Sequence, residues 1–427
     1  MKIDMDNAQV CIVGLGYVGL PLACLCAKKG YETIGYDIDK GLITELAQGT
    51  TRINENSLKE KLVLVKDKIK FSSNAEVIRN ADIVIISVPT PINKNYKPNL
   101  IPLISAVKDT KENLKIGALI LLESTIFPGT SEEVVLPLFK PFVVGKDFYL
   151  AHCPERIDPG NKAWSTNNIP RVVGGITETC AEQAYEFYKS ILDADVLKLN
   201  SIKAAEATKI MENSFRDINI AFVNEMAKSF DKMGIDIMEV IKAASTKPFA
   251  FMPHYPGCGV GGHCIPVDPY YLIEKAKETG FEHKFLQLAR EINNSMPDYT
   301  VEKVVDVLNK VEKSVMGTRI TVLGLAYKPN VNDMRESPSF KIIELLEKKG
   351  AKLIIYDPHV PEKSTVQSLN EALNTDCIVL ATGHDEFKQI TPSLLNEHGV
   401  KVVIDGRNFF DEKMMTSPDI LFVGIGK

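Results

Sequence analysis

The sequence predicts an α/β protein in which two Rossmann-like, doubly wound parallel-sheet domains are joined by a central helical domain with a long connecting helix. Three observations predict this fold. A strand, glycine turn, helix and strand open the chain; apolar strand-like runs alternate with helix-compatible stretches at both ends; and a long stretch without Pro or Gly lies between them. We place the domains at residues 1–199, 200–310 and 311–427.

The opening unit carries the pattern of a dinucleotide-binding site. The apolar run Gln9 to Val13 ends in a G-x-G-x-x-G turn, and after a helix-compatible segment the run Glu32 to Tyr36 ends at Asp37. The glycines permit a tight turn and close approach of a pyrophosphate, and Asp37 is placed to bind ribose hydroxyls. A 2′-phosphate would meet this carboxylate, so NAD is favoured over NADP. The predicted NAD-binding residues here are Gly14, Gly16, Tyr17, Val18, Gly19 and Asp37.

The same region could be mistaken for a membrane span, because Val10 to Ala27 is an 18-residue stretch without a charged residue. Its flank is acidic, it contains glycines and Pro21, and it changes from strand-like to helix-like midway. We interpret it as a buried strand, a tight turn and a buried helix.

Further strand-like runs lie at 83–88, 118–122 and 148–150. The loops after the first two, residues 87–91 and 123–130, should lie at the carboxyl edge of the sheet, where open α/β sheets bind ligands. Hydroxyls and backbone amides in these loops could therefore touch the nicotinamide half of the cofactor, although simple turn chemistry explains any single residue equally well. The residues predicted to line the cofactor there are Thr90, Pro91 and Ser124.

The long helix predicted over Ser201 to Met233 places four polar residues on one face, since Glu206, Lys209, Asn213 and Arg216 follow at intervals of three and four. A solvated charged face is the usual meaning of such a pattern. The alternative is a face that lines a cleft, where Lys209 stabilises an oxyanion, Asn213 orients water, and the lysine lowers the pKa of a neighbouring thiol.

Residues 257–269 pack four glycines around Cys264 and place Asp268 four residues after it. Such a loop would hold a thiol in a fixed place, which makes Cys264 a candidate nucleophile, while a buried structural cysteine is the alternative. Zinc binding by His254, Cys258, His263 and Cys264 is disfavoured, because their spacing is unlike paired zinc ligands. We predict no metal.

From Arg319 the α/β rhythm returns, with strand-like runs at 320–324, 353–356, 377–381 and 402–405. The net charge of −5, with both signs interspersed, argues against a nucleic-acid or membrane partner and favours a small molecule. Eight cysteines without a paired framework fit a reducing compartment, so we expect a cytoplasmic protein.

Taken in order, these motifs resemble the UDP-glucose/GDP-mannose dehydrogenases over nearly the full length. That family oxidises the C6 alcohol of a nucleotide sugar to a carboxylate with NAD. The motifs that carry the resemblance are the glycine turn with Asp37, Val88-Pro89-Thr90-Pro91, Glu123-Ser124-Thr125, Cys153-Pro154-Glu155-Arg156, Glu206-Ala207-Thr208-Lys209 with Asn213, Gly261-Gly262-His263-Cys264 with Asp268, and Ala326-Tyr327-Lys328 with Arg335-Glu336-Ser337.

The resemblance implies a role for each matched residue. Cys264 would be the nucleophile, and Lys209, Asn213, Asp268, Glu155 and Thr125 would handle protons, water and oxyanions. Arg335 would reach the cofactor. The implied substrate-binding residues are Glu155, Arg156, Lys209, Asn213, Arg216, Gly261 and Lys328. As in the family, the central helical domain is expected to form a homodimer.

Two departures bear on the substrate. UDP-glucose dehydrogenases carry a second glutamate shortly after the one that matches Glu155, whereas this chain reads Asp158-Pro159-Gly160 there, which is similar to the branch acting on UDP-N-acetylhexosamines. The segment Thr246 to Pro256 is similar to UDP-N-acetylglucosamine 6-dehydrogenases and unlike the mannosamine enzymes. The alternatives are the manno and galacto epimers, then a two-electron hydroxyacid dehydrogenase, and a binding module without turnover.

Overall fold

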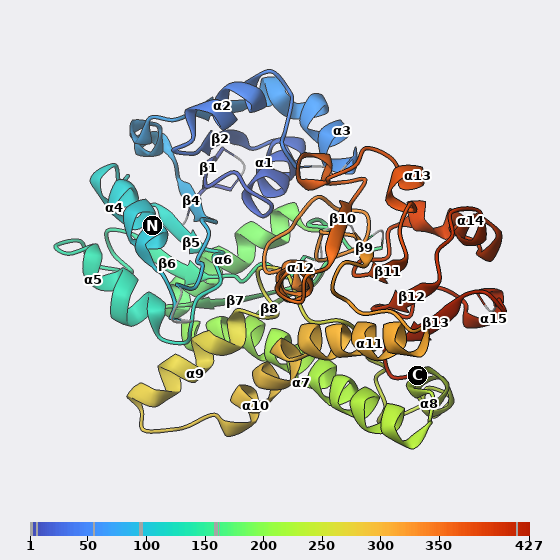
Figure 1. Ribbon diagram of the computed structural model, residues 1–427. Helices are drawn as coiled ribbons and strands as arrows, with labels where there is room; N and C mark the ends of the chain where they lie inside the picture. Colours follow the sequence, from blue (N-terminus) through green and yellow to red (C-terminus); the bar gives the residue numbers. More distant parts are fainter. Residues whose placement is uncertain are drawn as a thin grey trace. The chain divides into compact units, whose positions relative to one another are not determined.

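The computed structural model describes residues 3–5, 7–53, 56–93, 97–157, 161, 163–415 and 417–427. It divides into two compact units, one of residues 1–212 with 270–281 and one of residues 213–269 with 282–427. Each contains one sheet with helices on its faces (Figure 1). The predicted fold class, two Rossmann-like sheets and a central set of helices, is confirmed.

The sheet of the first unit has the strand order β3-β2-β1-β4-β5-β6-β7-β8, so the direction of winding reverses between β1 and β4. Ligands bind at such a switch point, outside the carboxyl ends of the strands. The strands are β1 (Gln9–Val13), β2 (Glu32–Tyr36), β3 (Ile69–Ser72), β4 (Ile83–Ile86), β5 (Leu119–Leu122), β6 (Tyr149–His152), β7 (Arg171–Gly175) and β8 (Val196–Lys198).

Helices cover both faces of this sheet, which is why β4 and β5 are entirely apolar and entirely buried. One strand pair departs from the predicted parallel arrangement, because β7 runs antiparallel to β6. The helices of this part of the chain are α1 (Gly19–Lys28), α2 (Lys40–Ala47), α3 (Asn56–Val65), α4 (Ile101–Glu112), α5 (Leu136–Leu138) and α6 (Glu178–Ile191).

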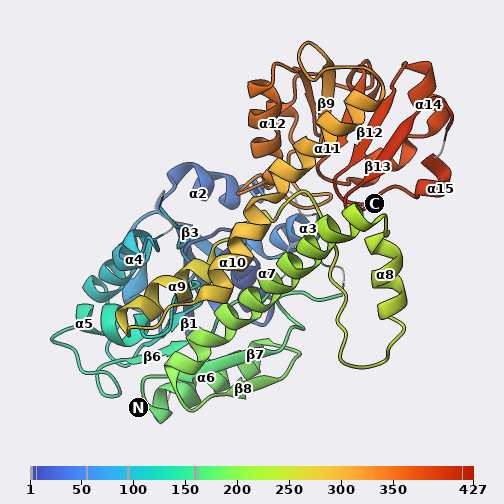
Figure 2. The same cartoon turned by 60° about the horizontal axis from the view of Figure 1, so that its bottom comes forward.

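The predicted long helix is α7, and it is followed by a helical region that contains the glycine loop. Figure 2 shows α10 alongside α7, where the Arg290 guanidinium donates to the Asp217 carboxylate at 2.6 Å. None of the helices formed by the described residues combines the length and apolar character that a bilayer crossing requires. The helices of this region are α7 (Ile202–Met233), α8 (Ile237–Ala244), α9 (Asp268–Glu278), α10 (Lys284–Asn294) and α11 (Met296–Lys310).

The sheet of the second unit is parallel throughout, in the order β10-β9-β11-β12-β13. Its winding reverses between β9 and β11. The elements are β9 (Arg319–Leu323), α12 (Pro338–Lys348), β10 (Lys352–Tyr356), α13 (Leu369–Ala372), β11 (Cys377–Leu380), α14 (Pro392–Glu397), β12 (Val402–Asp405), α15 (Glu412–Met415) and β13 (Leu421–Gly424).

Candidate active site

The glycine turn between β1 and α1 has the shape that a dinucleotide requires. Gly14 has φ +92°, and a Cβ at Gly19 would lie 1.9 Å from the Gly14 carbonyl oxygen, so both glycines are required by the turn itself. Apart from its own chain neighbours, none of the described residues has an atom within 4 Å of a Cβ built at Gly16. The space beside Gly16 is therefore open to a ligand, and α1 begins there without a side-chain cap, as a phosphate-binding helix N-terminus would. Tyr17 and Val18 lie in the same turn.

Asp37 follows β2 and is half-buried, as a ribose-binding acid would be. One of its oxygens accepts the backbone N–H of Leu15 at 2.9 Å, and the other accepts that of Asp39 at 2.9 Å. These bonds fix the carboxylate beside the glycine turn and leave it lone pairs for hydroxyl donors. The residues present therefore fit NAD.

The loops after β4 and β5 are joined to each other by their hydroxyl groups. Thr90 donates to the Thr125 carbonyl oxygen at 2.7 Å, and Ser124 donates to the Val88 carbonyl oxygen at 2.7 Å. The Tyr271 hydroxyl in turn donates to the Thr90 carbonyl oxygen. These hydroxyls hold the carboxyl edge of the sheet together, so only their acceptor lone pairs, and not their protons, are available to a cofactor.

The residues of the polar face predicted on α7 differ in burial. Glu206 is buried and accepts the backbone N–H groups of Gly129 and Ser131 at 2.5 and 2.8 Å. Burial raises the pKa of Glu206, against the pull of these donors. A solvated face is therefore wrong for this residue, which fixes the loop after β5; Lys209 is half-buried and Arg216 is exposed.

The glycine loop is shaped by the second sheet. The Cys258 amide donates to the Gly406 carbonyl oxygen at 2.9 Å, and Arg407 donates to the Gly259 carbonyl oxygen at 3.1 Å. A Cβ at Gly261 would lie 2.8 Å from both the Glu336 carbonyl oxygen and the Tyr327 Cβ. The dense glycines thus allow the loop to pack directly on residues that follow β9 and β12.

Cys264 lies at the end of this loop, and the backbone N–H of Asp268 donates to its carbonyl oxygen at 2.8 Å, where α9 begins. The thiol is partly exposed, whereas the other seven cysteines are buried. Asp268 is buried, and the Asn213 amide donates to its carboxylate at 2.5 Å. These hydrogen bonds connect Asn213 of α7, Asp268 and the cysteine loop.

Glu155 and Arg156 lie in the loop after β6 and are both engaged. Glu155 is buried and accepts the backbone N–H groups of Arg156 and Ile157. The Arg156 guanidinium pairs with Glu212 at 2.6 Å and donates to the Pro170 carbonyl oxygen. The segment Asp158-Pro159-Gly160, which bears on the substrate, lies outside the described residues.

The second sheet contains an acid that matches Asp37 in position, but it is not available to a ribose. Asp357 follows β10, is fully buried, and accepts the amides of Leu325 and Ala326 and the His384 ring. Burial opposes ionisation, yet the His384 contact and the amides lower the pKa of Asp357.

Two further residues predicted to bind ligands lie in the chain after β9. The Arg335 guanidinium donates to both oxygens of the Asp333 carboxylate. Lys328 is half-buried in the segment after β9.

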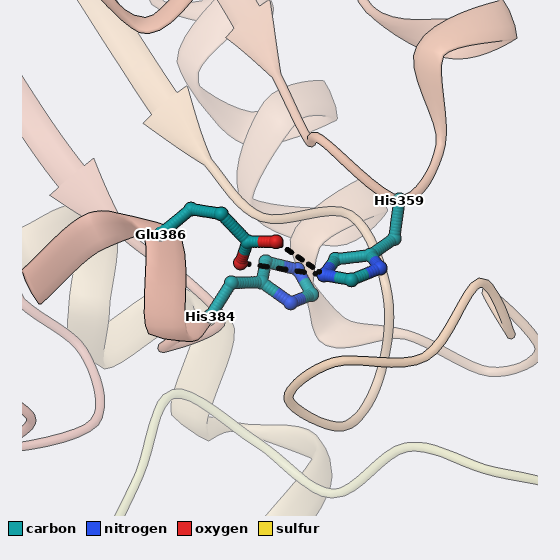
Figure 3. Close-up of side chains that lie close together, drawn as sticks. All are labelled: His359, His384 and Glu386. Carbon is teal, nitrogen blue, oxygen red and sulfur yellow. Dashed lines mark hydrogen bonds and ion pairs between the residues drawn. The ribbon is translucent and has the colours of Figure 1, made fainter. Parts of the chain in front are cut away.

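Among the described residues, one group of potential metal ligands converges, and it is His359, His384 and Glu386 (Figure 3). His384 is committed elsewhere, because its Nδ1 accepts the Asn330 N–H at 2.9 Å and its Nε2 lies 3.0 Å from Asp357. Only His359, at 3.2 Å from Glu386, faces that carboxylate. Hydrogen bonds therefore account for this group without a metal ion.

Sequence reasoning missed several buried residues that support the site. Asn224 of α7 accepts the Gly257 N–H at 3.0 Å and donates to Asn293, which ties the start of the glycine loop to α7 and α10. Arg171 lies buried against Glu155 and near Glu123, a residue that the sequence had offered only as part of a motif and without a role. The sequence offered one sign, an arginine at the start of an otherwise apolar strand, which requires a buried partner.

Comparison with protein families identifies three successive regions. Residues 8–192 match the NAD binding domain of the UDP-glucose/GDP-mannose dehydrogenase family, residues 203–295 its central domain, and residues 321–412 its UDP binding domain.

Individual relatives match over nearly the whole chain. A UDP-N-acetyl-D-glucosamine 6-dehydrogenase of Pseudomonas aeruginosa is 37% identical, with 96% of this chain and 98% of the relative covered. A UDP-N-acetyl-D-mannosamine dehydrogenase of Methanococcus maripaludis is 38% identical, covering 96% and 95%. The solved structure of a UDP-D-ManNAc dehydrogenase from Pyrococcus horikoshii superposes with a TM-score of 0.92 at 36% identity, covering 98% and 99%.

Proposed function

Because this chain belongs to the UDP-glucose/GDP-mannose dehydrogenase family and is an NAD-dependent oxidoreductase, we propose that it oxidises the C6 hydroxyl of UDP-N-acetylglucosamine to the carboxylate. The observation that supports this chemistry is the hydrogen bond from the Asn213 side chain to the buried Asp268 carboxylate. The backbone N–H of Asp268 in turn donates to the Cys264 carbonyl oxygen. A thiol, a carboxylate and an amide donor are the groups that covalent aldehyde oxidation requires.

The proposed reaction removes four electrons. NAD bound at the glycine turn would supply the hydride acceptor at C6, and two successive NAD molecules would serve the two oxidations. Between them, Cys264 attacks the aldehyde to give a thiohemiacetal, which becomes a thioester after the second oxidation. Water then cleaves the thioester and releases the uronic acid and the thiol.

The other proposed roles concern charge and water. Lys209 and Asn213, one turn apart on α7, would stabilise the oxyanions, because fixed donors act most strongly where negative charge develops. Asp268 would accept the proton of the hydrolytic water, and Glu155 would assist this step through Thr125 or a water molecule. Tyr17 and Val18 would complete the cofactor turn, with Asp37 on its ribose, and Arg335 would reach the cofactor.

The identity of the hexosamine is the finer part of the proposal. Relatives named for the gluco and the manno substrates are 37% and 38% identical, so overall identity does not separate them. The proposal rests on the segment 246–256, which differs from the mannosamine pattern and exposes Phe249, Met252 and Tyr255. Arg156, Arg216, Gly261 and Lys328 are the further residues proposed to bind substrate, in a protein that acts as three domains with the bounds given above.

We further propose a cytoplasmic homodimer formed through the central helices. Phe215 and Phe222 on α7 and Phe285 and Leu288 on α10 are exposed apolar residues, which monomeric proteins rarely gather on neighbouring helices. The seven buried cysteines are free thiols, as expected in a reducing compartment.

The reaction is tested by substituting Cys264→Ala and measuring uronic acid formed from UDP-N-acetylglucosamine. We expect no acid, and undiminished acid would exclude the covalent mechanism. The epimer is tested by comparing kcat/KM for the gluco, manno and galacto substrates, of which the gluco value should be the highest.

A further inference from the structure

A buried group of charged side chains lies behind the loop that carries Glu155. Arg171, the first residue of β7, is 1% exposed, and its Nη2 donates to Oε2 of Glu155. Its Nη1 lies 3.6 Å from Oε1 of Glu123, which is outside hydrogen-bonding range. The Tyr188 hydroxyl donates to the same Glu123 oxygen at 2.6 Å. One arginine thus faces two carboxylates but bonds only one of them.

The hydrogen bonds of Glu155 leave it little freedom. Its Oε1 accepts the N–H groups of Arg156 and Ile157 at 2.6 and 2.9 Å, which uses both lone pairs of that oxygen. Its Oε2 accepts Arg171. Among the described residues, these are the donors to this carboxylate, so the remaining lone pair belongs to Oε2, the oxygen that Arg171 holds.

We propose that Arg171 is a positioning residue, which sets the direction of the one lone pair through which Glu155 acts on the hydrolytic water. This inference rests on the proposed function and refines one step of it. Arginine suits the role because its planar fork fixes a carboxylate in orientation as well as in distance. Burial raises the pKa of Glu123 to about 7, against the opposing charge of Arg171. Because Glu123 accepts the Tyr188 hydroxyl, the hydrogen bond of Arg171 goes to Glu155.

Arg171 acts on thioester hydrolysis and not on hydride transfer, which separates its role from a general loss of structure. In Arg171→Met, the first turnover should still release two NADH per active site. Steady-state turnover should then fall by roughly ten- to a hundredfold, the range expected for a lost charge-assisted hydrogen bond. The thioester on Cys264 should accumulate, and mass spectrometry of the quenched enzyme would detect it.

A double-mutant cycle provides the second readout. If Arg171 acts through Glu155, then Arg171→Met combined with Glu155→Gln should be no slower than Glu155→Gln alone. Losses that multiply, or a first turnover slowed as much as the steady state, would overturn the inference. Lys198→Met, which breaks an exposed pair with Glu182, is the matched control and should leave both phases unchanged.

Arg171→Met leaves two buried carboxylates without a cation, so this variant is prone to unfold. Arg171→Lys keeps the charge without the planar fork, and should give the same burst and the same non-additivity at a smaller loss. A fully active Arg171→Lys with normal hydrolysis would contradict the claim about orientation. If the unmodified enzyme made no NADH from any UDP-N-acetylhexosamine, the proposed function would fail, and this inference with it. If the unmodified enzyme is active but the losses caused by the Arg171 and Glu155 substitutions multiply, only the role of Arg171 is excluded.

Discussion

Substituting Gly16→Ala should weaken NAD binding without destabilising the protein. In the part of the chain that the structure describes, a Cβ at this position has no atom within 4 Å apart from its chain neighbours, and the φ of Gly16 is not in the left-handed region. Alanine should therefore be neutral or raise stability by up to about 1 kcal/mol, because it restricts the unfolded chain. The same methyl group would occupy the space that a pyrophosphate needs, and we expect at least a tenfold weaker affinity, about 1.4 kcal/mol.

Gly19→Ala is the matched comparison, three residues away in the same turn. Its Cβ would lie 1.9 Å from the Gly14 carbonyl oxygen and 2.5 Å from the Ser87 hydroxyl oxygen, so the turn itself must move. Overpacking of this kind costs about 1–3 kcal/mol or more. Calorimetric titration with NAD and a thermal scan without it separate the two effects. If Gly16→Ala binds NAD as tightly as the original protein at unchanged stability, the space beside Gly16 does not hold the pyrophosphate.

Three further predictions concern other parts of the molecule. Burial lowers the pKa of His152 from 6.5 to about 3, so between these pH values the unfolded state binds a proton that the folded state does not. The free energy of unfolding should therefore fall as the pH drops from about 6.5 towards 3. His152→Gln should flatten this slope, as measured by urea unfolding across that range. Asn224→Ala leaves the buried Gly257 N–H without its acceptor and should cost about 1–3 kcal/mol in the same assay, whereas a neutral change would show that the loop is held by other contacts. Iodoacetamide should modify one thiol of the native protein, Cys264, because the other seven are buried, and peptide mapping that finds several modified cysteines would contradict the described burial.

Much of the fold follows from local patterns in the sequence. The strands β1 and β2 have the predicted bounds, and the glycine turn between them follows from residue types that few other structures require. Four strands were not predicted from the sequence, namely β3, β7, β8 and β13. Of these, β7 begins with a buried charge and β8 has only three residues, so neither shows the apolar run that marks β1 and β2. Their pairing depends on contacts with distant parts of the chain.

In the candidate site, too, some features could be predicted from the sequence and others depend on packing between distant segments. The family resemblance implied a shared role for Asn213 and Asp268, and the structure shows a hydrogen bond between their side chains. The sequence did not predict that Glu206 would be buried, because its partners Gly129 and Ser131 come from a loop more than 70 residues earlier in the chain. The hydroxyls of Thr90 and Ser124 likewise donate to carbonyl oxygens of the neighbouring loop, a pairing that depends on the packing of the two loops and is not visible in the sequence.

The four-electron reaction is tested by the amount of NADH formed per UDP-N-acetylglucosamine consumed, with excess NAD and purified protein. Two NADH per sugar are expected, because an alcohol that becomes a carboxylate loses four electrons. One NADH per sugar, with an aldehyde or ketone as product, would contradict the four-electron reaction and would indicate a two-electron dehydrogenase in which Cys264 forms no bond to the substrate.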